Sequence, residues 1–302
     1  MRKLKQNKFR RPLRRNSFDY INEAFFFLFC ISVIFPVWDM IMRSLAMPDQ
    51  ATSLSIVLFP SQPTLSAYRY VFASSKIINA FFVSVARTVI GTLLALLVTM
   101  CAAFPLSKPD LPGRNFFTAM FLIVMFFSGG LIPTYLLNRR LGLVDSLAVY
   151  ILPTLVNSYH IILARNYLMS LDKGMEESAL IDGANYFQIL VRIIMPVTKP
   201  LMATLGLWIA VAHWNAWFDA LIYSHSGRID VLQLILYRMR WMAEGTRNDK
   251  IADIMRGDPS LNIVSQTIQM ATTVVIMFPI ICVYPFIQKY FVKGIMVGSL
   301  KG

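Results

Sequence analysis

Residues 81–106 read FFVSVARTVIGTLLALLVTMCAAFPL and contain a single charged residue, Arg87. The run is long enough to cross a bilayer, because a membrane-spanning helix needs about 20 apolar residues. A surface helix of a soluble protein would instead alternate apolar and polar faces over this length. Inside lipid, a helix satisfies its own backbone polar groups. The run therefore predicts a transmembrane helix within an all-α fold.

The composition extends this prediction to the rest of the chain. Of 302 residues, 56% are hydrophobic and 15% charged, whereas a soluble domain usually carries about 25% charged residues. The apolar residues cluster in long runs, which predicts a polytopic transmembrane helical bundle of about six spans. The further predicted spans are Glu23–Met42, Phe116–Leu137, Leu147–Leu168, Pro200–Tyr223 and Thr267–Ile287.

Positive charge is concentrated at the N-terminus. The formal net charge is +13, and residues 1–15 read MRKLKQNKFRRPLRR, with many basic residues and no acid. Basic residues beside an apolar run mark the cytoplasmic side of a membrane, whereas nucleic-acid binding would need a basic face on a soluble module. No small-residue cleavage site follows, so we expect a retained anchor. We interpret residues 1–19 as a cytoplasmic tail and residues 20–302 as one transmembrane domain.

Counting spans from this tail assigns a side to each loop. An even number of spans places both termini in the cytoplasm. Segment 170–199 is then cytoplasmic, and the long segment 224–264 is external. Arg139 and Arg140 fall in a short external loop, against the positive-inside tendency, which the N-terminal cluster outweighs.

Residues typical of metal or nucleotide chemistry are scattered or missing. Cys30, Cys101 and Cys282 lie in separate apolar runs, which indicates packing rather than disulfides or zinc. The three histidines are likewise far apart in the sequence. No GxxxxGK[ST] phosphate loop occurs, so we expect no metal site, no bound cofactor and no ATP hydrolysis by this chain alone.

Glycine and proline interrupt two of the predicted spans. Ser128-Gly129-Gly130 and Pro133 fall in the third, and Pro153 falls in the fourth. Such residues either break a helix that lines a cavity or allow neighbouring helices to pack closely. The sequence leaves both readings open.

Segment 170–199, SLDKGMEESALIDGANYFQILVRIIMPVTK, is too polar for a span and too regular for a random loop. Asp172 is placed to cap a short helix, and Gly183 to end it in the left-handed conformation. A second amphipathic helix follows, and Pro196 breaks it before the fifth span. We expect a helix–turn–helix lying on the cytoplasmic face.

This segment resembles the EAA signature of ABC importer permeases, with a serine where the family usually has its central alanine. In that family the loop docks into a cleft of the ATPase subunit. The resemblance implies a small, rigid knob whose alanines and glycine allow close approach and whose acids make polar contacts. The implied ATPase-coupling residues are Glu177, Ser178, Ala179, Asp182, Gly183, Ala184 and Pro196.

Two further stretches are similar to the carbohydrate class of these permeases, close to the branch for complex or uronic-acid oligosaccharides. They are FSGGLIPTYLL at 127–137 and YPFIQKYFVKGIMVGSLKG at 284–302. The resemblance implies a type I importer fold in a bacterial cytoplasmic membrane. It also implies a second homologous permease, a pair of ATPase subunits that bind ATP and Mg²⁺, and an extracytoplasmic sugar-binding protein, which segment 224–264 would contact.

The fifth span carries the residues that best suit contact with a sugar. At about 100° per residue, Trp208, Asn215 and Asp219 fall on one side, where an aromatic ring can stack on sugar and polar groups can bind hydroxyls. Trp214 and Trp217 fall on another side, as in an interfacial aromatic belt. We expect Arg87 to snorkel toward the membrane surface.

Three other functions compete with oligosaccharide import. The cargo of such a permease would alternatively be a peptide or an inorganic anion. An intramembrane enzyme would need clustered carboxylates or histidines near one membrane face, but the acids here lie mostly in loops. A channel without an ATPase would leave the pattern of segment 170–199 unexplained.

Overall fold

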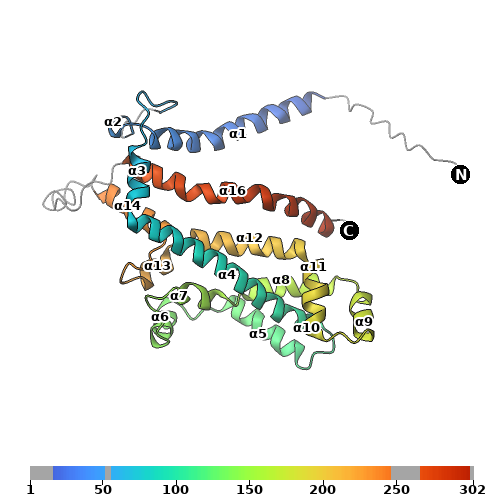
Figure 1. Cartoon of the computed structure of the whole chain (residues 1–302). Coiled ribbons are helices and arrows are strands. Elements are labelled where there is room, and N and C mark those ends of the chain that lie inside the picture. Colours follow the sequence, from blue (N-terminus) through green and yellow to red (C-terminus); the bar gives the residue numbers. More distant parts are fainter. Residues whose placement is uncertain (1–15, 52–55, 246–265, 300–302) are drawn as a thin grey trace.

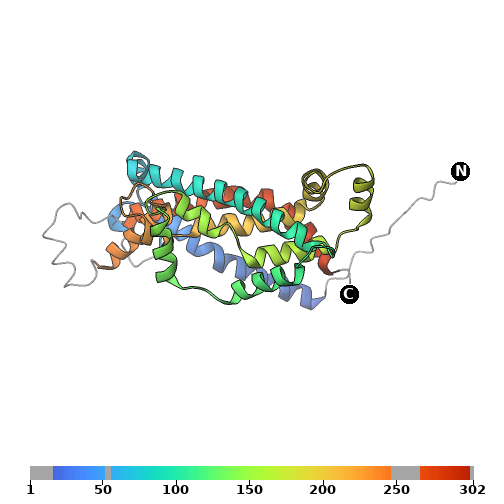
Figure 2. The same cartoon turned by 90° about the horizontal axis from the view of Figure 1, so that it is seen from below.

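A computed structural model describes residues 16–51, 56–245 and 266–299, and these residues form helices and no strands. Three helices are each long and apolar enough to cross a membrane: α1 (Ser17–Ser44), α4 (Ser75–Ser107) and α16 (Gln266–Ser299). In Figure 1, α1, α16 and α12 (Lys199–Asn215) run in roughly one direction, and α4 slants across it. Figure 2 shows the same bundle turned by 90°. The predicted all-α bundle is confirmed.

The other three predicted spans are interrupted. The third consists of α5 (Arg114–Phe126) and α6 (Leu131–Arg140), which meet at 113°. By length and composition, the described residues contain three uninterrupted spans, or up to five if each bent helix pair counts as one. The fourth predicted span is divided into α7 (Ala148–Ile151), a 3-10 turn (Leu152–Thr154) and α8 (Ser158–Met169). The fifth is divided into α12 and α13 (Phe218–Tyr223).

Short helices gather at the two ends of the bundle (Figure 1). At one end, with α6, α7 and α13, lie α2 (Pro48–Ala51), α3 (Ser66–Ala73) and α14 (Leu232–Gly245). At the other end lie α9 (Gly174–Ile181), α10 (Tyr186–Ile189), a π-helical turn (Leu190–Ile194) and α11 (Met195–Val197).

The start of α1 and the end of α16 both lie at the α9 end, which agrees with the prediction that the termini share a side (Figure 1). Most of the predicted basic tail, residues 1–15, lies outside the described residues, as do residues 246–265 of segment 224–264. The described part of that segment contains α14, so it is more ordered than the long loop that the sequence predicts.

The glycines of the third predicted span break a helix within this chain. A Cβ added at Gly129 or Gly130 would meet nothing within 4 Å, and Gly130 has a φ of 83°. Neighbouring side chains bond to the backbone of Gly130 at this break. The Ser128 hydroxyl accepts a bond from the Gly130 amide at 3.3 Å, and the Thr134 hydroxyl donates to the Gly130 carbonyl at 2.7 Å. For these residues the structure favours the broken helix over close packing.

Close packing occurs instead at Gly91, where α4 crosses α12. A Cβ built there would lie 2.5 Å from Nε2 of His213, and the His213 side chain is only 5% exposed. The ring therefore has little room to move. The contact brings α4 and α12 together near the middle of the bundle.

We predict that Gly91→Val destabilises the folded protein by about 1–3 kcal/mol, because a branched side chain would collide with the buried imidazole. The measurement is the thermal unfolding midpoint of the detergent-solubilised protein. Gly129→Ala is the matched control, since its added methyl group meets no atom. Equal midpoints for Gly91→Val and the wild type would contradict close packing at this position.

Candidate functional site

The first half of segment 170–199 folds as the glycine predicts. Gly183 has a φ of 82°. Its amide donates to the Leu180 carbonyl at 3.0 Å, and the Ala184 amide donates to the Ala179 carbonyl at 2.9 Å. This is a Schellman ending of α9. The predicted cap is off by one residue: Lys173 is the N-cap, and the Asp172 carboxylate accepts from the Gly174 amide at 3.0 Å.

The second half of the segment is anchored beneath the bundle. Asn185 and Gln188 form a reciprocal capping box at the start of α10. Ile189 and Ile194 are fully buried in a core shared with α4, α8 and α12. The chain then turns by 83° at Thr198, whose hydroxyl donates to the Ile194 carbonyl at 2.8 Å.

Pro196 lies two residues before this turn, so it marks the end of the helix, as predicted, without being the corner itself. A proline has no amide hydrogen to donate to the carbonyl four residues earlier. The π-helical turn directly before α11 is consistent with this missing bond.

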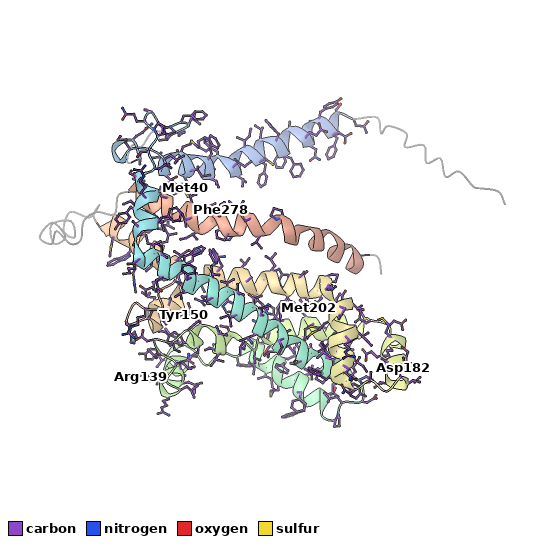
Figure 3. All side chains as sticks on the ribbon, in the orientation of Figure 1. Met40, Arg139, Tyr150, Asp182, Met202 and Phe278 are labelled. Atoms are coloured by element: carbon purple, nitrogen blue, oxygen red, sulfur yellow. The ribbon has the colours of Figure 1, made fainter. Side chains whose placement is uncertain are left out.

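The predicted coupling residues divide into an exposed set and a buried set. Ala179 is 7% exposed and packs in the core, and Ala184 is half-buried against it. The remaining predicted residues are exposed. Asp182 lies at the tip of the bundle (Figure 3), and Pro196 lies in α11. Two large apolar neighbours on this exposed surface, Ile181 (86% exposed) and Phe187 (70%), were not singled out from the sequence. Tyr186, which helical spacing groups with the buried Ile189, is 60% exposed.

A single ion pair ties α9 to the end of α4. The ammonium group of Lys108, the residue after α4, pairs with the carboxylate of Glu176, and it lies 4.2 Å from the centre of the Phe104 ring. Burial, with a smaller contribution from the charge of Lys173, lowers the pKa of Lys108. The pair links the exposed tip to a transmembrane helix.

The predicted sugar-contact residues lie in different surroundings. Trp208 is 40% exposed on α12 and stacks beside Tyr159 of α8, with ring centres 6.5 Å apart. Asn215, the last residue of α12, accepts a bond from the Gln233 amide of α14 at 3.3 Å. Asp219 lies beyond an extended residue, Ala216, that ends the helix, so the prediction of one continuous face is wrong for Asp219.

Arg87 does not snorkel. It is 1% exposed, and its guanidinium donates to both oxygens of Asp219 at 3.2 and 2.5 Å. It also donates to the carbonyl of Ala216 at 3.4 Å and lies 4.4 Å from the centre of the Tyr150 ring. The prediction of snorkelling is wrong because the helix break frees the Ala216 carbonyl, which needs a hydrogen-bond donor inside the membrane. The buried guanidinium of Arg87 supplies that donor, whereas a side chain extended to the membrane surface would not. The sequence did offer a signal for this pair, since Arg87 and Asp219 carry opposite charges and both fall inside predicted spans.

The two remaining tryptophans of the fifth predicted span do not form an interfacial belt. Trp214 is buried, and its indole nitrogen donates to the Ile276 carbonyl of α16 at 3.2 Å. Trp217 stacks on Tyr237 of α14 with ring centres 4.1 Å apart. Both rings therefore pack against other helices of the same chain.

No family model matches the chain. It is 37% identical over 292 residues to the polygalacturonan/rhamnogalacturonan transport system permease protein YtcP of Bacillus subtilis, covering 96% of this chain and 100% of that protein. It is also 37% identical over 271 residues to Protein LplC of the same organism, covering 89% and 90%.

A solved bacterial ABC transporter involved in the import of the acidic polysaccharide alginate has a chain with the same fold. The TM-score is 0.80 at 30% identity, over 91% of this chain and 96% of that chain. This chain belongs to the ABC transporter permease family. A second match, at 17% identity and a TM-score of 0.53, comes from an alginate transporter in complex with an alginate pentasaccharide-bound periplasmic protein, and it supports the fold alone.

The permease is thus a multi-pass membrane protein and a transport subunit. Its tip at 170–199 lies at the end of the bundle where α1 begins, and α13, which carries Asp219, lies at the other end (Figure 1). Asp145 also holds the latter end together. Its carboxylate accepts bonds from the amides of His225 and Ser226, and the bonds from Ser226 and His225 lower its pKa.

We predict that Arg87→Ala lowers the stability of the permease by about 3 kcal/mol, because it removes the cation that pairs with Asp219 and the donor to the Ala216 carbonyl. Thermal unfolding of the solubilised protein measures the loss. Arg228→Ala, which removes an exposed arginine, is the control and should change little. The double variant Arg87→Leu/Asp219→Leu should recover part of the loss. A midpoint for Arg87→Ala equal to that of the control would refute a structural role for the pair.

Proposed function

We propose that this chain is the permease subunit of an importer that carries oligosaccharides, including acidic polysaccharide fragments, across the cytoplasmic membrane. The observation that carries this proposal is full-length similarity to a permease named for polygalacturonan and rhamnogalacturonan transport. The 30% identity with the alginate importer chain agrees with it. Both named polymers and alginate are rich in acidic sugars, so an acidic cargo is the common element.

The proposal includes separate partners for energy and for cargo. A second, homologous permease would complete the pathway, a pair of ATPase subunits would bind ATP and Mg²⁺, and an extracytoplasmic binding protein would deliver the sugar. The absence of a phosphate-loop motif from the sequence supports the separation of the ATPase.

We further propose that the exposed tip of α9–α10 docks on the ATPase. The exposed coupling residues would contact the ATPase, with Ile181 and Phe187 supplying apolar area. Ala179 and Ala184 would instead seat the tip against the bundle. The buried face of the same segment contacts α4, α8 and α12, so a displacement of the tip would move these helices as a unit. The tip, and with it both termini, would be cytoplasmic.

The sugar path remains a proposal for Trp208 and Asn215, which share one face of α12. Trp208 offers an exposed ring, and Asn215 offers an amide near Gln233. For Asp219 the bonds to Arg87 favour a positioning role at the path over direct contact with cargo.

Uptake by proteoliposomes tests the function. The permease, its partner permease and the ATPase pair are reconstituted with the binding protein outside. We expect ATP-dependent accumulation of a labelled oligogalacturonate that stops when ATP is omitted. Accumulation of a peptide or an inorganic anion instead of the oligosaccharide would refute the proposed cargo, and chemical modification of the sugar without accumulation would favour an enzyme.

Coupling is tested by Gly183→Asp in the same liposomes. We expect uptake and transport-linked ATP hydrolysis to fall more than tenfold, since an added carboxylate would project from the docking surface. Gly142→Asp is the matched control. Gly142 has a φ of 70° and equally open surroundings, so the backbone strain is similar, but it lies at the opposite end of the bundle. If both variants lose activity equally, or if neither does, the docking assignment is wrong.

A further inference from the structure

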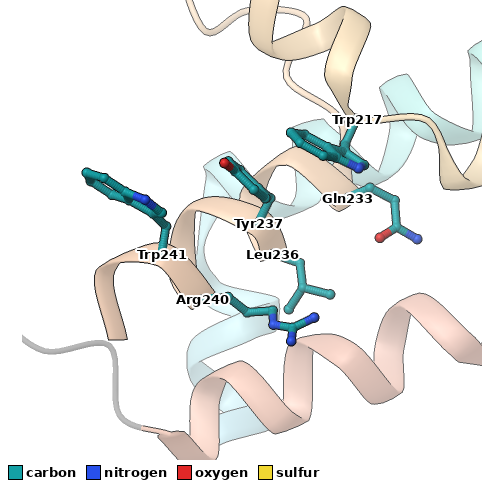
Figure 4. A pocket seen from close by; sticks show the side chains of 6 residues that line it. All are labelled: Trp217, Gln233, Leu236, Tyr237, Arg240 and Trp241. Carbon is teal, nitrogen blue, oxygen red and sulfur yellow. The ribbon is translucent and has the colours of Figure 1, made fainter. Parts of the chain in front are cut away.

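A pocket of about 320 Å³ opens beside α14, at the end of the bundle opposite the α9–α10 tip. Trp217 enters it from the break between α12 and α13, and the other lining residues come from one face of α14 (Figure 4). That face repeats every three or four residues, as expected for one side of a helix. The lining residues are Trp217, Gln233, Leu236, Tyr237, Arg240 and Trp241.

Aromatic rings form one wall of this pocket. Trp217 covers one face of Tyr237, with ring centres 4.1 Å apart and planes 17° from parallel. Tyr237 stands between Trp217 and Trp241 (Figure 4). The Trp241 side chain is 61% exposed. The stacked pair therefore holds Tyr237 in place while its other side faces Trp241, and an amphipathic ring held in this way can stack on a sugar.

The other wall is polar and cationic. Gln233 and Arg240 lie on the same side of α14 with Leu236 between them (Figure 4). Within the described residues, no carboxylate pairs with Arg240, although Arg238 two positions earlier donates to Asp230 at 2.6 Å and Arg87 pairs with Asp219. Among the side chains that the structure describes, Arg240 thus differs from Arg238 and Arg87 in presenting its charge to the pocket without a carboxylate partner.

We propose that this pocket is a subsite for one acidic sugar residue of the cargo, at the entrance of the permease. Tyr237 and Trp241 contact the ring of the sugar, Gln233 binds a hydroxyl, and the Arg240 guanidinium binds the carboxylate. A planar guanidinium matches a carboxylate with two parallel hydrogen bonds, which a neutral sugar cannot accept in this form. The volume and the single cation fit one uronic-acid unit.

The inference rests on the proposed function and adds selectivity to it. Most of a path must bind weakly for cargo to move on, and one partly exposed charge contact is compatible with release. The subsite would favour entry of charged oligosaccharides over neutral ones after the binding protein has delivered them. It lies outside the segment that we propose for ATPase docking, so its loss should spare ATP hydrolysis in the absence of cargo.

The test compares an oligogalacturonate with its methyl ester in the reconstituted system, and each variant is normalised to the wild type for the same sugar. This ratio removes the selectivity of the binding protein. Arg240→Gln should lower uptake of the acid about tenfold and leave uptake of the ester unchanged, because the amide keeps most of the side chain but not the charge. Trp241→Ala should lower uptake of both, because stacking does not depend on charge.

Arg228→Gln is the charge control, since Arg228 is exposed at the same end and does not line the pocket. ATP hydrolysis without cargo and co-purification of the subunits confirm that each variant assembles. Equal losses for acid and ester in Arg240→Gln would instead indicate an interface with another subunit, and they would overturn the subsite, as would no loss at all. A wild-type complex that imports neither sugar would overturn the proposed function as well.

Discussion

The close contact between α4 and α12 organises the rest of this permease. Gly91 lets the buried imidazole of His213 lie against the α4 backbone, so two long helices run together through the bundle. Other parts of the chain take their positions from this pair. The α9–α11 segment and α8 pack against one half of the pair, and α3, α14 and α16 pack around the other half.

Three of the predicted spans are interrupted, and at each interruption a nearby side chain bonds to the backbone. Lipid offers no partner to a freed carbonyl or amide, so a break is tolerated only where protein groups replace the missing bonds. At the break after α12, Arg87 donates to the Ala216 carbonyl. At the start of α8, the Asn157 side chain accepts a bond from the His160 amide at 3.1 Å. At the break between α5 and α6, the hydroxyls of Ser128 and Thr134 bond to the backbone of Gly130. The breaks are therefore built features, and two of the proposed functional groups, Trp217 and Asp219, lie just beyond one of them.

The two ends of the bundle differ in a way that suits their proposed roles. The α9–α10 tip presents apolar side chains and a glycine turn on a segment whose other face is packed into the core, which suits the transmission of a rigid movement. The opposite end presents an aromatic and cationic pocket on α14, which suits weak contact with a polar cargo. The ion pair between buried Arg87 and partly buried Asp219 joins α4 to the end of the broken fifth span.

Local chemistry alone determined the membrane class, the helical fold and the turn at Gly183. Long apolar runs have few solutions in lipid, and a left-handed helix ending strongly favours glycine. Resemblance to known permeases added the family. Only the tertiary structure decided that Arg87 reaches Asp219, 132 positions away, that Ala179 faces inward, and that the face shared by Trp208 and Asn215 stops before Asp219. The physical reason is that a helix break redirects every later side chain, and a buried charge finds its partner only when distant helices pack together.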